Sequence, residues 1–481
     1  MSVAYSSPHM ALFTDLYELT MAQGFFLSGR QEQRARFDYF FRNQPFEGGY
    51  VLFAGLKDLC AQLGSLRFDD EALRYLEELR FAPEFLEYLK AWRFEGNVRA
   101  VKEGEVVFPL EPIVQVEGDL IETQIIESLL LNILNFESLI ATKASRIAHA
   151  CDGRPFAEFG LRRAQGLGAI HATHAAMIGG ASATSNLLAS AMHEIPARGT
   201  QAHSWIQQFD TELEAFRSWA NLYPDECVLL VDTYNTLNSG IPHAMTVAKE
   251  LEQRGKRLLA IRLDSGDLAY LSKKARAMLD ANGLQQVKIY ATNQLDEHLI
   301  KSLLDQGAPI DLFGVGTRLV TGHPDGALDG VYKLATRQGR PSLKISDNFT
   351  KVNLPGHKDL WRILDKEGRF YGDAISLSEE GSPVETIHHP YFPEQQSSIG
   401  HREQHALLED VMRAGELVTE LASTSEAAAY ARKRLELLPS EHRRFDNPHT
   451  YKVGATAKLL DMRRDLYQAI RKSIQAEERD A

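Results

Sequence analysis

The sequence has few cysteines, no long apolar run and no excess of positive charge. Its three cysteines, Cys60, Cys151 and Cys227, are too widely spaced for a disulfide framework or a zinc site, which favours a reducing compartment. No apolar run approaches the ~18–20 residues that span a bilayer, and the first ten residues lack the basic start and apolar stretch of a secretory signal. A formal net charge of -12 argues against nucleic-acid or membrane partners. We therefore expect a cytoplasmic protein that binds neither.

The chain does contain a regular series of buried runs in an ordinary globular composition. Its 481 residues, 44% hydrophobic and 25% charged, are enough for two or three domains. Short apolar runs occur at 228–231, 258–261, 287–290 and 310–313. Their polar ends, at 232, 262, 293 and 314, are 30, 31 and 21 residues apart, which fits one strand, one helix and two loops each. The sequence therefore predicts a series of βα units.

The run Ala-Ile-Arg-Leu-Asp-Ser-Gly-Asp-Leu at 260–268 carries the strongest sign of chemistry. An apolar strand leads there directly into Arg262, Asp264 and Asp267, with a glycine at the turn. One such loop alone could be a salt-bridged surface turn. Four strands that end in polar residues indicate instead the active-site rim at the carboxyl end of an α/β sheet or barrel.

Four further segments contain residues suited to an anionic or planar ligand. The arginine pair of Gly-Leu-Arg-Arg at 160–163 matches phosphate geometry, although a surface pair at a helix start is the plain alternative. The hydroxyl-rich segment 180–186 could be a helix cap or the wall of a small planar substrate site. His203, within 199–204, follows a predicted strand, and a single histidine is often structural. Gly-Val-Gly-Thr-Arg at 314–318 could cradle a phosphate or form only a turn.

The pattern of runs changes along the chain and predicts its domain organisation. Residues 96–119 are short apolar runs separated by glycine and proline, which indicates a small sheet ahead of the βα units. We expect an N-terminal α+β domain over 1–120, completed by about 331–400, a barrel of βα units over 121–330, and a mostly helical region over 401–481.

In this order, the segments resemble nicotinate phosphoribosyltransferases over nearly the whole chain. The resemblance rests on Phe13-Thr-Asp-Leu-Tyr-Glu-Leu-Thr-Met, Phe159-Gly-Leu-Arg-Arg-Ala-Gln-Gly, Gly199-Thr-Gln-Ala-His-Ser, Ile261-Arg-Leu-Asp-Ser-Gly-Asp, Gly314-Val-Gly-Thr and Gly330-Val-Tyr-Lys-Leu. It implies an α/β fold in which an irregular α/β barrel packs with an α+β domain. It also implies that nicotinate and 5-phosphoribosyl 1-pyrophosphate (PRPP) give nicotinate mononucleotide and pyrophosphate in NAD salvage. Mg²⁺ would act on the pyrophosphate, and ATP hydrolysis would be coupled through a transiently phosphorylated His203.

The residues and the resemblance together predict a set of site residues. His203, as the phosphohistidine, and Asp264 are expected to be catalytic. Nicotinate is expected to contact Tyr17, Phe159, Thr200, Arg262 and Ser185, and PRPP or its phosphates to contact Arg162, Asp232, Asp267, Asn293, Gly316 and Thr317. Asp264 and Asp267 also suit hydrated Mg²⁺, but the direct metal ligands are not identified. In related enzymes the tyrosine comes from the neighbouring subunit, so the resemblance implies a homodimer with shared active sites.

Three alternatives remain open at this point. Enzymes that use nicotinamide carry an aspartate at the position of Ser185 and Gly-Tyr-Arg in place of Gly-Leu-Arg-Arg, and an aspartate would repel a carboxylate. The sequence therefore favours nicotinate. A barrel lyase or isomerase acting on a sugar phosphate would need a lysine or a dedicated base at a strand end, where no lysine is found. A non-catalytic nucleotide-binding regulator would be expected to have lost the polar strand ends.

Overall fold

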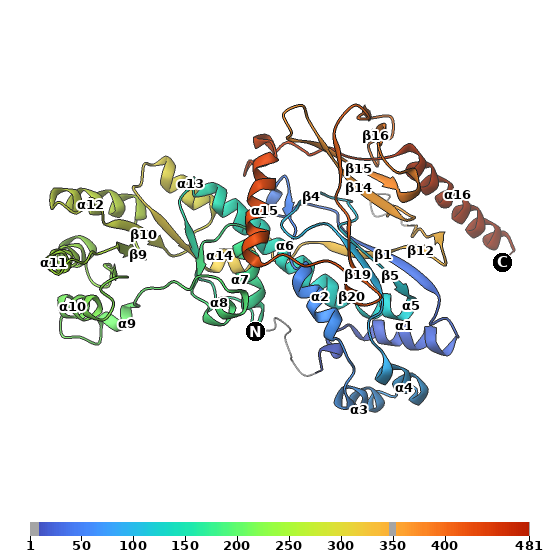
Figure 1. Cartoon of the computed structure of the whole chain (residues 1–481), viewed down its shortest axis with the longest axis horizontal. Coiled ribbons are helices and arrows are strands. Elements are labelled where there is room, and N and C mark those ends of the chain that lie inside the picture. Colours follow the sequence, from blue (N-terminus) through green and yellow to red (C-terminus); the bar gives the residue numbers. More distant parts are fainter. Residues whose placement is uncertain (1–8, 346–352, 481) are drawn as a thin grey trace. The chain divides into compact units, whose positions relative to one another are not determined.

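The computed structural model describes residues 9–345 and 353–480, which divide into two compact units (Figure 1). Unit 1 combines residues 1–139 with 327–481, and unit 2 consists of residues 140–326. The expected boundaries were instead near residues 120 and 330, with 401–481 as a separate region. Residues 1–8, where no secretory signal is expected, lie outside the described residues, as do 346–352 and 481.

Unit 2 is built on a six-stranded sheet in which all neighbouring strands are parallel. The strand order is β7-β6-β11-β10-β9-β8. The strands are β6 (Phe156–Glu158), β7 (Ala183–Thr184), β8 (Val228–Leu230), β9 (Ala260–Leu263), β10 (Lys288–Thr292) and β11 (Leu312–Val315). The sheet curls but stays open, with β7 and β8 as its edges, so it forms a half-barrel in place of the irregular barrel that we expected. Parallel strands need crossover connections, which helices provide here.

Three of these helices connect successive strands of the half-barrel. They are α11 (Ile241–Gln253), α12 (Leu268–Ala281) and α13 (Glu297–Asp305). The other helices of unit 2 are α7 (Gly168–Ile178), α8 (Leu187–His193), α9 (His203–Ile206), α10 (Glu212–Leu222) and α14 (Thr317–Val320), and a π-helical turn spans Thr236–Gly240. The four predicted strands and the helices between them are confirmed. Because the strands are parallel, the polar residues that follow them lie along one edge of the sheet, which we call the carboxyl edge.

Unit 1 contains two larger sheets and a small one. A seven-stranded antiparallel sheet has the order β13-β12-β1-β5-β3-β19-β20, and a six-stranded sheet has the order β17-β16-β21-β15-β14-β18. In the first, β1 (Arg34–Phe41) lies between β5 (Val114–Asp119) and β12 (Gly330–Arg337), so chain from both sides of unit 2 meets in one sheet. Phe37, Tyr39 and Phe41 alternate along β1 and are buried in the main core of unit 1.

The remaining strands of unit 1 complete these sheets. The seven-stranded sheet also contains β3 (Asn97–Ala100), β13 (Arg340–Pro341), β19 (Glu409–Arg413) and β20 (Glu416–Leu417). The six-stranded sheet consists of β14 (Lys358–Leu364), β15 (Phe370–Leu377), β16 (Thr386–His388), β17 (Gln396–Ser398), β18 (Gln404–Ala406) and β21 (Val453–Ala455). A two-stranded sheet pairs β2 (Val51–Leu52) with β4 (Val106–Val107).

The C-terminal region differs from the mostly helical segment that we expected over 401–481. Its first part, 404–417, contributes the edge strands β18 and β20 and the inner strand β19, and only the later part forms the helices α15 (Thr424–Leu437) and α16 (Ala457–Asp480). β18 pairs with β14 and β19 pairs with β3, both distant in sequence, so the residues of these short strands carry a weak signal of their own. The helical expectation was therefore wrong for 404–417.

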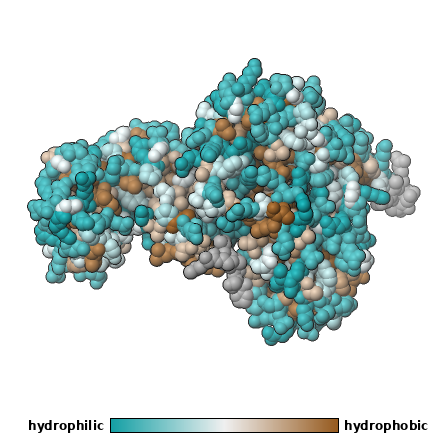
Figure 2. All heavy atoms as spheres, in the orientation of Figure 1, coloured by the Kyte–Doolittle hydropathy of each residue, from teal (hydrophilic) through white to brown (hydrophobic). Residues whose placement is uncertain are grey.

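Five further helices of unit 1 contribute buried side chains to its main core. They are α1 (Leu16–Leu27), α2 (Leu56–Ser65), α3 (Asp70–Glu78), α4 (Pro83–Ala91) and α5 (Leu120–Ile125), while α6 (Glu127–Ala150) runs across the division between the units. Hydrophilic residues cover most of the face seen in Figure 2. Among the described residues, no helix combines the length and apolarity needed to cross a membrane. The three cysteines are free and buried, and burial raises the pKa of each thiol to about 12.

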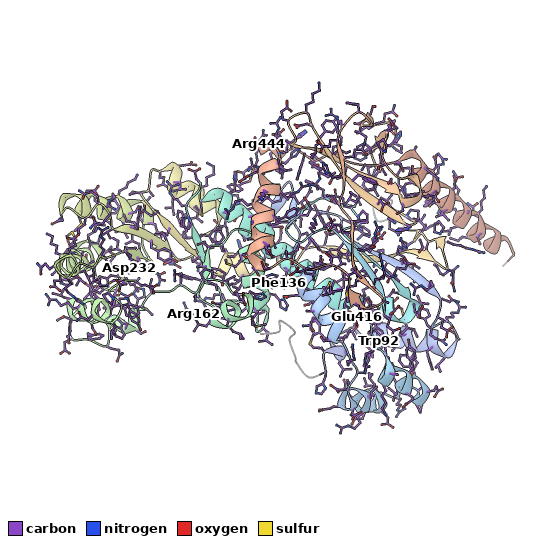
Figure 3. All side chains as sticks on the ribbon, in the orientation of Figure 1. Trp92, Phe136, Arg162, Asp232, Glu416 and Arg444 are labelled. Atoms are coloured by element: carbon purple, nitrogen blue, oxygen red, sulfur yellow. The ribbon has the colours of Figure 1, made fainter. Side chains whose placement is uncertain are left out.

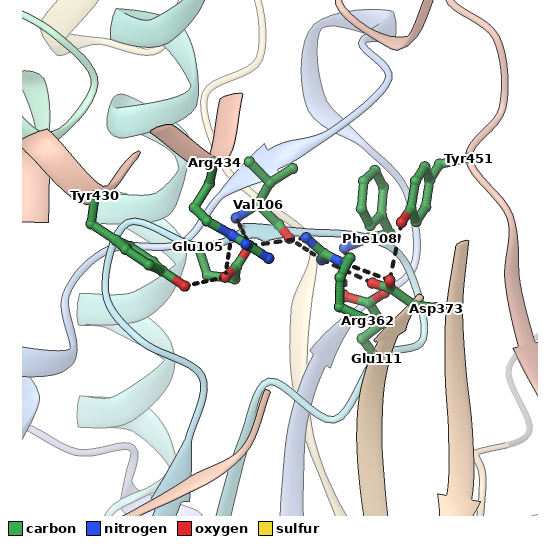
Figure 4. A network of polar contacts seen from close by, with 9 residues as sticks. All are labelled: Glu105, Val106, Phe108, Glu111, Arg362, Asp373, Tyr430, Arg434 and Tyr451. Carbon is green, nitrogen blue, oxygen red and sulfur yellow. Dashed lines mark hydrogen bonds and ion pairs between the residues drawn. The ribbon is translucent and has the colours of Figure 1, made fainter. Parts of the chain in front are cut away.

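A buried ionic network joins the six-stranded sheet to α15 within unit 1 (Figure 4). Arg362 on β14 donates to both carboxylate oxygens of Asp373 on β15, at 2.6 and 2.9 Å, and through Nη1 to Glu105 at 3.0 Å. Arg434 on α15 donates to the same Glu105 at 2.9 Å. Arg362 has no exposed surface, so its charge depends entirely on these carboxylates for compensation.

Candidate functional site

The side chain of Arg262 lies at the carboxyl edge and is held by three neighbours. Arg262 is the third residue of β9 and only 16% of its side chain is exposed. Its Nε donates to the Thr292 hydroxyl at 2.9 Å, Nη1 donates to the Thr200 hydroxyl at 2.8 Å, and Nη2 donates to Asp264 Oδ1 at 2.7 Å. Each nitrogen thus has one fixed partner, and each Nη still carries a second hydrogen for a ligand.

Two aspartates beside Arg262 are tied to each other through the turn that follows β9. Asp232 Oδ2 accepts hydrogen bonds from the Asp264 N–H at 2.8 Å and from the Ser265 hydroxyl at 2.6 Å. The other oxygen of Asp232 is buried and has no hydrogen-bond partner among the described residues. A buried carboxylate oxygen without a donor is costly, so this atom is suited to a cation or a donor group on a ligand.

His203 is the first residue of α9, and its ring faces Asp264. Its Nδ1 is 3.0 Å from the hydroxyl of Thr233, and its Nε2 is 3.7 Å from Asp264 Oδ2. About 40% of its side chain is exposed, so a reagent can reach the ring. The structure therefore brings His203, Asp264 and Arg262 together from three segments of unit 2.

Phe159 follows β6 and packs closely against Gly314 and Gly316 of the glycine-rich turn at 314–318. Its N–H donates to the Val315 carbonyl at 2.8 Å, and its ring centre is 5.9 Å from that of Tyr290. A Cβ on Gly314 would lie 2.9 Å from the Phe159 ring, and a Cβ on Gly316 would lie 2.9 Å from its carbonyl oxygen. Both glycines are thus required by the packing of Phe159, whatever they do for a ligand.

The glycine-rich turn at 314–318 is a weaker anion site than its sequence suggests. The helix that follows it, α14, has four residues, which is too short for a substantial dipole. Arg318, the cation at the end of this turn, is engaged by Asp296. Gly316 and Thr317 still lie at the carboxyl edge, directly after β11. A phosphate here would have to rely on backbone N–H groups and the Thr317 hydroxyl.

Asp267 and Asn293 have conformational roles that the sequence analysis did not assign. One oxygen of Asp267 caps α12 by accepting the Tyr270 N–H at 3.0 Å, so its other oxygen is the more available one for a ligand. Asn293 is exposed and adopts a left-handed backbone with φ of 81°, a conformation that asparagine tolerates better than most residues. Asn293 therefore forms the turn after β10 and presents its amide at the surface.

Ser185 and Arg162 lie on two exposed loops that share a buried anchor, Glu158. Glu158 accepts hydrogen bonds from the Gly160 N–H and from the hydroxyl groups of Thr173 and Thr184. Its backbone carbonyl accepts the Ser185 N–H at 3.1 Å. Figure 3 shows Arg162 and Asp232 on separate loops of unit 2. Glu158 thus holds both predicted ligand loops in place without being exposed itself.

Twelve of the predicted site residues lie in unit 2, and Tyr17 lies in unit 1. Tyr17 is on α1 and is 48% exposed, beside the exposed apolar residues Leu16 and Met21. The sequence analysis missed Thr233, Thr292 and Glu158 as site residues. Thr292 and Glu158 are the last residues of β10 and β6, and Thr233 lies three residues beyond β8, so a place at or just after the carboxyl end of a strand is the signal that could have identified them.

No ready-made metal cage is present in the described part of unit 2. No three histidine, cysteine or carboxylate ligand atoms within this unit converge to the distances that a metal ion needs. Mg²⁺ usually keeps several waters and binds through one or two carboxylates together with substrate phosphates. Asp232, with its unpartnered oxygen, and Asp264 fit that manner of binding.

Comparison with known proteins gives matches along nearly the whole chain. The model of the nicotinate phosphoribosyltransferase (NAPRTase) N-terminal domain matches residues 12–135, that of the NAPRTase family matches 155–374, and that of the C-terminal domain matches 357–463. The nicotinate phosphoribosyltransferase of Bacillus subtilis is 40% identical over 486 residues and covers 98% of each chain. Nicotinate phosphoribosyltransferase pncB2 of Mycobacterium tuberculosis is 41% identical, over 94% of this chain and 92% of its own. The crystal structure of human nicotinic acid phosphoribosyltransferase matches with a TM-score of 0.85 at 30% identity, over 94% of this chain and 99% of that one.

Proposed function

Because this chain belongs to the nicotinate phosphoribosyltransferase family, we propose that the carboxyl edge of unit 2 is where it joins nicotinate to PRPP. The reaction gives nicotinate mononucleotide and pyrophosphate, a step of NAD salvage. One observation carries the assignment of the site. Arg262 is fixed by three neighbours at a strand end, next to two aspartates and a histidine. A charged side chain held in this way is preorganised for an anionic substrate.

Nicotinate is bound through its carboxylate and its ring. The free hydrogens on the two Nη atoms of Arg262 pair with the carboxylate, since a planar guanidinium matches carboxylate geometry. The Thr200 hydroxyl, already fixed by Arg262, lies beside that carboxylate. Phe159 covers one face of the pyridine ring, and Ser185 offers a hydroxyl without negative charge. An uncharged residue at 185 and a positive one at 262 favour nicotinate over nicotinamide.

PRPP is bound by the loops that follow the strands. Asp232, Asp264 and Asn293 hold the ribose hydroxyls, and Arg162, Gly316 and Thr317 hold phosphate oxygens. The ring nitrogen of nicotinate forms a bond to the anomeric carbon as the bond to pyrophosphate breaks, and the leaving oxygen keeps the electron pair. Positive charge develops on the sugar in this step, and the carboxylate of Asp264 stabilises it. Positioning of the two reactants supplies much of the remaining acceleration.

Mg²⁺ would be held by Asp232 and Asp264, directly or through water, together with the substrate's own phosphates. When bound, it neutralises charge on the pyrophosphate leaving group. The unpartnered oxygen of Asp232 supports this assignment. The buried, unpaired cysteines support a reducing cytoplasm as the place where the enzyme works.

Product analysis by mass spectrometry tests the proposed function. Purified protein is incubated with PRPP and Mg²⁺ and with either nicotinate or nicotinamide, each with and without ATP. Nicotinate mononucleotide, formed in larger amount with ATP, is the expected product. Nicotinamide mononucleotide would overturn the choice of base but keep the reaction. If neither mononucleotide forms, a sugar-phosphate lyase becomes the hypothesis to test, although none of the described strand ends of the half-barrel carries a lysine.

His203→Ala is expected to abolish stimulation by ATP while leaving some PRPP-dependent turnover. The exposed imidazole beside Asp264 is the proposed phosphoryl acceptor, and alanine cannot form a phosphoramidate. Radiolabelled ATP should phosphorylate the wild-type chain in an acid-labile manner and leave the variant unlabelled. The matched control is His401→Ala, at an exposed histidine of unit 1. An acid-stable label, or normal stimulation of the variant, would show that another residue accepts the phosphoryl group.

Tyr17→Ala and Asp264→Asn chains should regain activity when they are mixed. We expect a homodimer in which Tyr17 of one subunit completes the site of the other, and the exposed apolar face of α1 gives a second subunit a surface to cover. Each variant alone should be nearly inactive. Random reassortment into twofold dimers restores one site in every mixed dimer, or about a quarter of the wild-type rate.

Two affinity tags would verify that the mixed dimers form before the rate is measured. Mixing Asp264→Asn with Arg262→Met, both in unit 2, is the control and should restore nothing. Mixed dimers without recovered activity would place Tyr17 in the site of its own subunit or outside the site.

A further inference from the structure

We infer that Thr292 is a positioning residue whose hydroxyl sets the geometry of both Arg262 and Asp264. It is the last residue of β10 and is 98% buried, with a relative exposure of 2%. Its oxygen accepts from Arg262 Nε at 2.9 Å, and its hydroxyl donates to Asp264 Oδ1. The inference rests on the roles proposed above for Arg262 and Asp264, and Thr292 itself need not touch the substrate.

The direction of both hydrogen bonds follows from the chemistry of the three groups. Arg262 can only donate, and an ionised Asp264 can only accept. The single hydrogen of the hydroxyl therefore points to Asp264, which is much closer than its other acceptor, the Leu263 carbonyl at 3.4 Å, while an oxygen lone pair faces Arg262. A hydroxyl is the smallest group that can do both, so Thr292 links the cation to the carboxylate in one defined orientation.

The rotamer of Thr292 is set by the neighbouring strand. A Cβ added to Gly314 on β11 would lie 2.6 Å from the Thr292 methyl carbon, so this methyl occupies the space that the glycine leaves free. On its other side, β10 pairs in parallel with β9, with Tyr290 opposite Arg262 and Ala291 opposite Leu263. The methyl therefore packs toward β11 while the hydroxyl faces β9. Because threonine is stiff at χ1, the packing of one group fixes the other.

This arrangement gives the two oxygens of Asp264 different neighbours. Oδ1 receives the Thr292 hydroxyl and Arg262 Nη2, whereas Oδ2 is the oxygen that faces His203 Nε2 at 3.7 Å. Arg262 is likewise held at Nε, which keeps the hydrogens on its Nη atoms oriented for a carboxylate. Loss of the hydroxyl should therefore affect both nicotinate binding and the chemical step.

Thr292→Val removes the hydroxyl and keeps nearly the same volume, and Thr292→Ser keeps the hydroxyl and removes the methyl. We expect the valine variant to lose about 100-fold in kcat/KM for nicotinate, a typical cost of a small misplacement in an active site. The loss should appear both as a higher KM for nicotinate and as a lower kcat. The serine variant should stay within several-fold of the wild type.

Thr123→Val is the matched control, because Thr123 is a buried threonine of α5 whose hydroxyl bonds only to carbonyls at the start of its own helix. It should leave both kinetic constants unchanged. Melting temperatures of all three variants show whether the chains are folded. Wild-type kinetics in a folded Thr292→Val chain, or a serine variant as impaired as the valine variant, would overturn the inference. If the wild-type chain itself forms no nicotinate mononucleotide, the proposed function fails, and the roles on which this inference rests fail with it.

Discussion

Replacing Arg362 by methionine is expected to lower the free energy of unfolding of unit 1 by about 3–5 kcal/mol. Arg362 is fully buried and compensates Asp373 and Glu105 through three charged hydrogen bonds (Figure 4). Methionine fills most of the volume but leaves two buried carboxylates with fewer donors. Urea denaturation should show the loss, and hydrogen exchange should increase first in β14 and β15. Activity at low temperature should remain, because this network contains none of the proposed site residues.

Glu111→Gln is the matched control within the same network, and its effect should depend on pH. The side chain of Glu111 faces Asp373, and burial, followed by the charge of Asp373, raises the pKa of Glu111 well above its usual value. A carboxyl whose pKa is raised on folding contributes its full stability below the unfolded pKa and loses it as pH rises through the folded pKa. Glutamine cannot lose this proton. The variant should therefore match the wild type near pH 4.5 and become the more stable of the two as pH increases.

Melting temperatures of the Glu111→Gln chain and the wild type at several pH values between about 4 and 9 would test this expectation. An Arg362→Met chain as stable as the wild type would mean that the buried carboxylates reach other donors or water. A Glu111→Gln chain that is destabilised at high pH would mean that Glu111 is ionised in the folded protein.

Arg262→Met is expected to reduce kcat/KM for nicotinate by about 1,000-fold, the scale of removing one partner of a desolvated charge pair. Methionine cannot pair with the carboxylate and also releases Thr200 and Thr292 from their fixed positions. Calorimetry should show that nicotinate binding is lost while the affinity for PRPP changes little. Arg262→Lys should also bind poorly, because a lysine keeps the charge without the planar fork.

Arg254→Met, at an exposed arginine that follows α11, is the control and should leave both affinities unchanged. Equal losses of nicotinate and PRPP affinity in the Arg262→Met chain would show that Arg262 does not bind the carboxylate of nicotinate specifically. It would then have a general role in keeping the carboxyl edge folded.

The strands of unit 2 and the residues that follow them could be predicted because the signal is local. A short apolar run identifies a buried strand, and the parallel connection sends every carboxyl end to the same edge, so Asp232, Asp264 and Asn293 lie along it, just after β8, β9 and β10. The same logic failed for 404–417, where β18 pairs with β14 and β19 pairs with β3, both of them distant in sequence. An edge strand depends on its partner's backbone more than on its own side chains.

The amino-acid sequence alone was enough to predict the βα series, the polar residues that follow its strands, and the family resemblance. Only the folded structure decided which of those polar residues act on one another. Arg262 is 62 residues from Thr200 and 30 from Thr292, and hydrogen bonds over such separations leave no local pattern. The sequence also does not show which polar side chains already have a partner within the fold. Asp267 caps a helix and Arg318 pairs with Asp296, and neither interaction was predicted. Residue type sets what a side chain can donate or accept, whereas the tertiary contacts determine which donors and acceptors remain for a substrate.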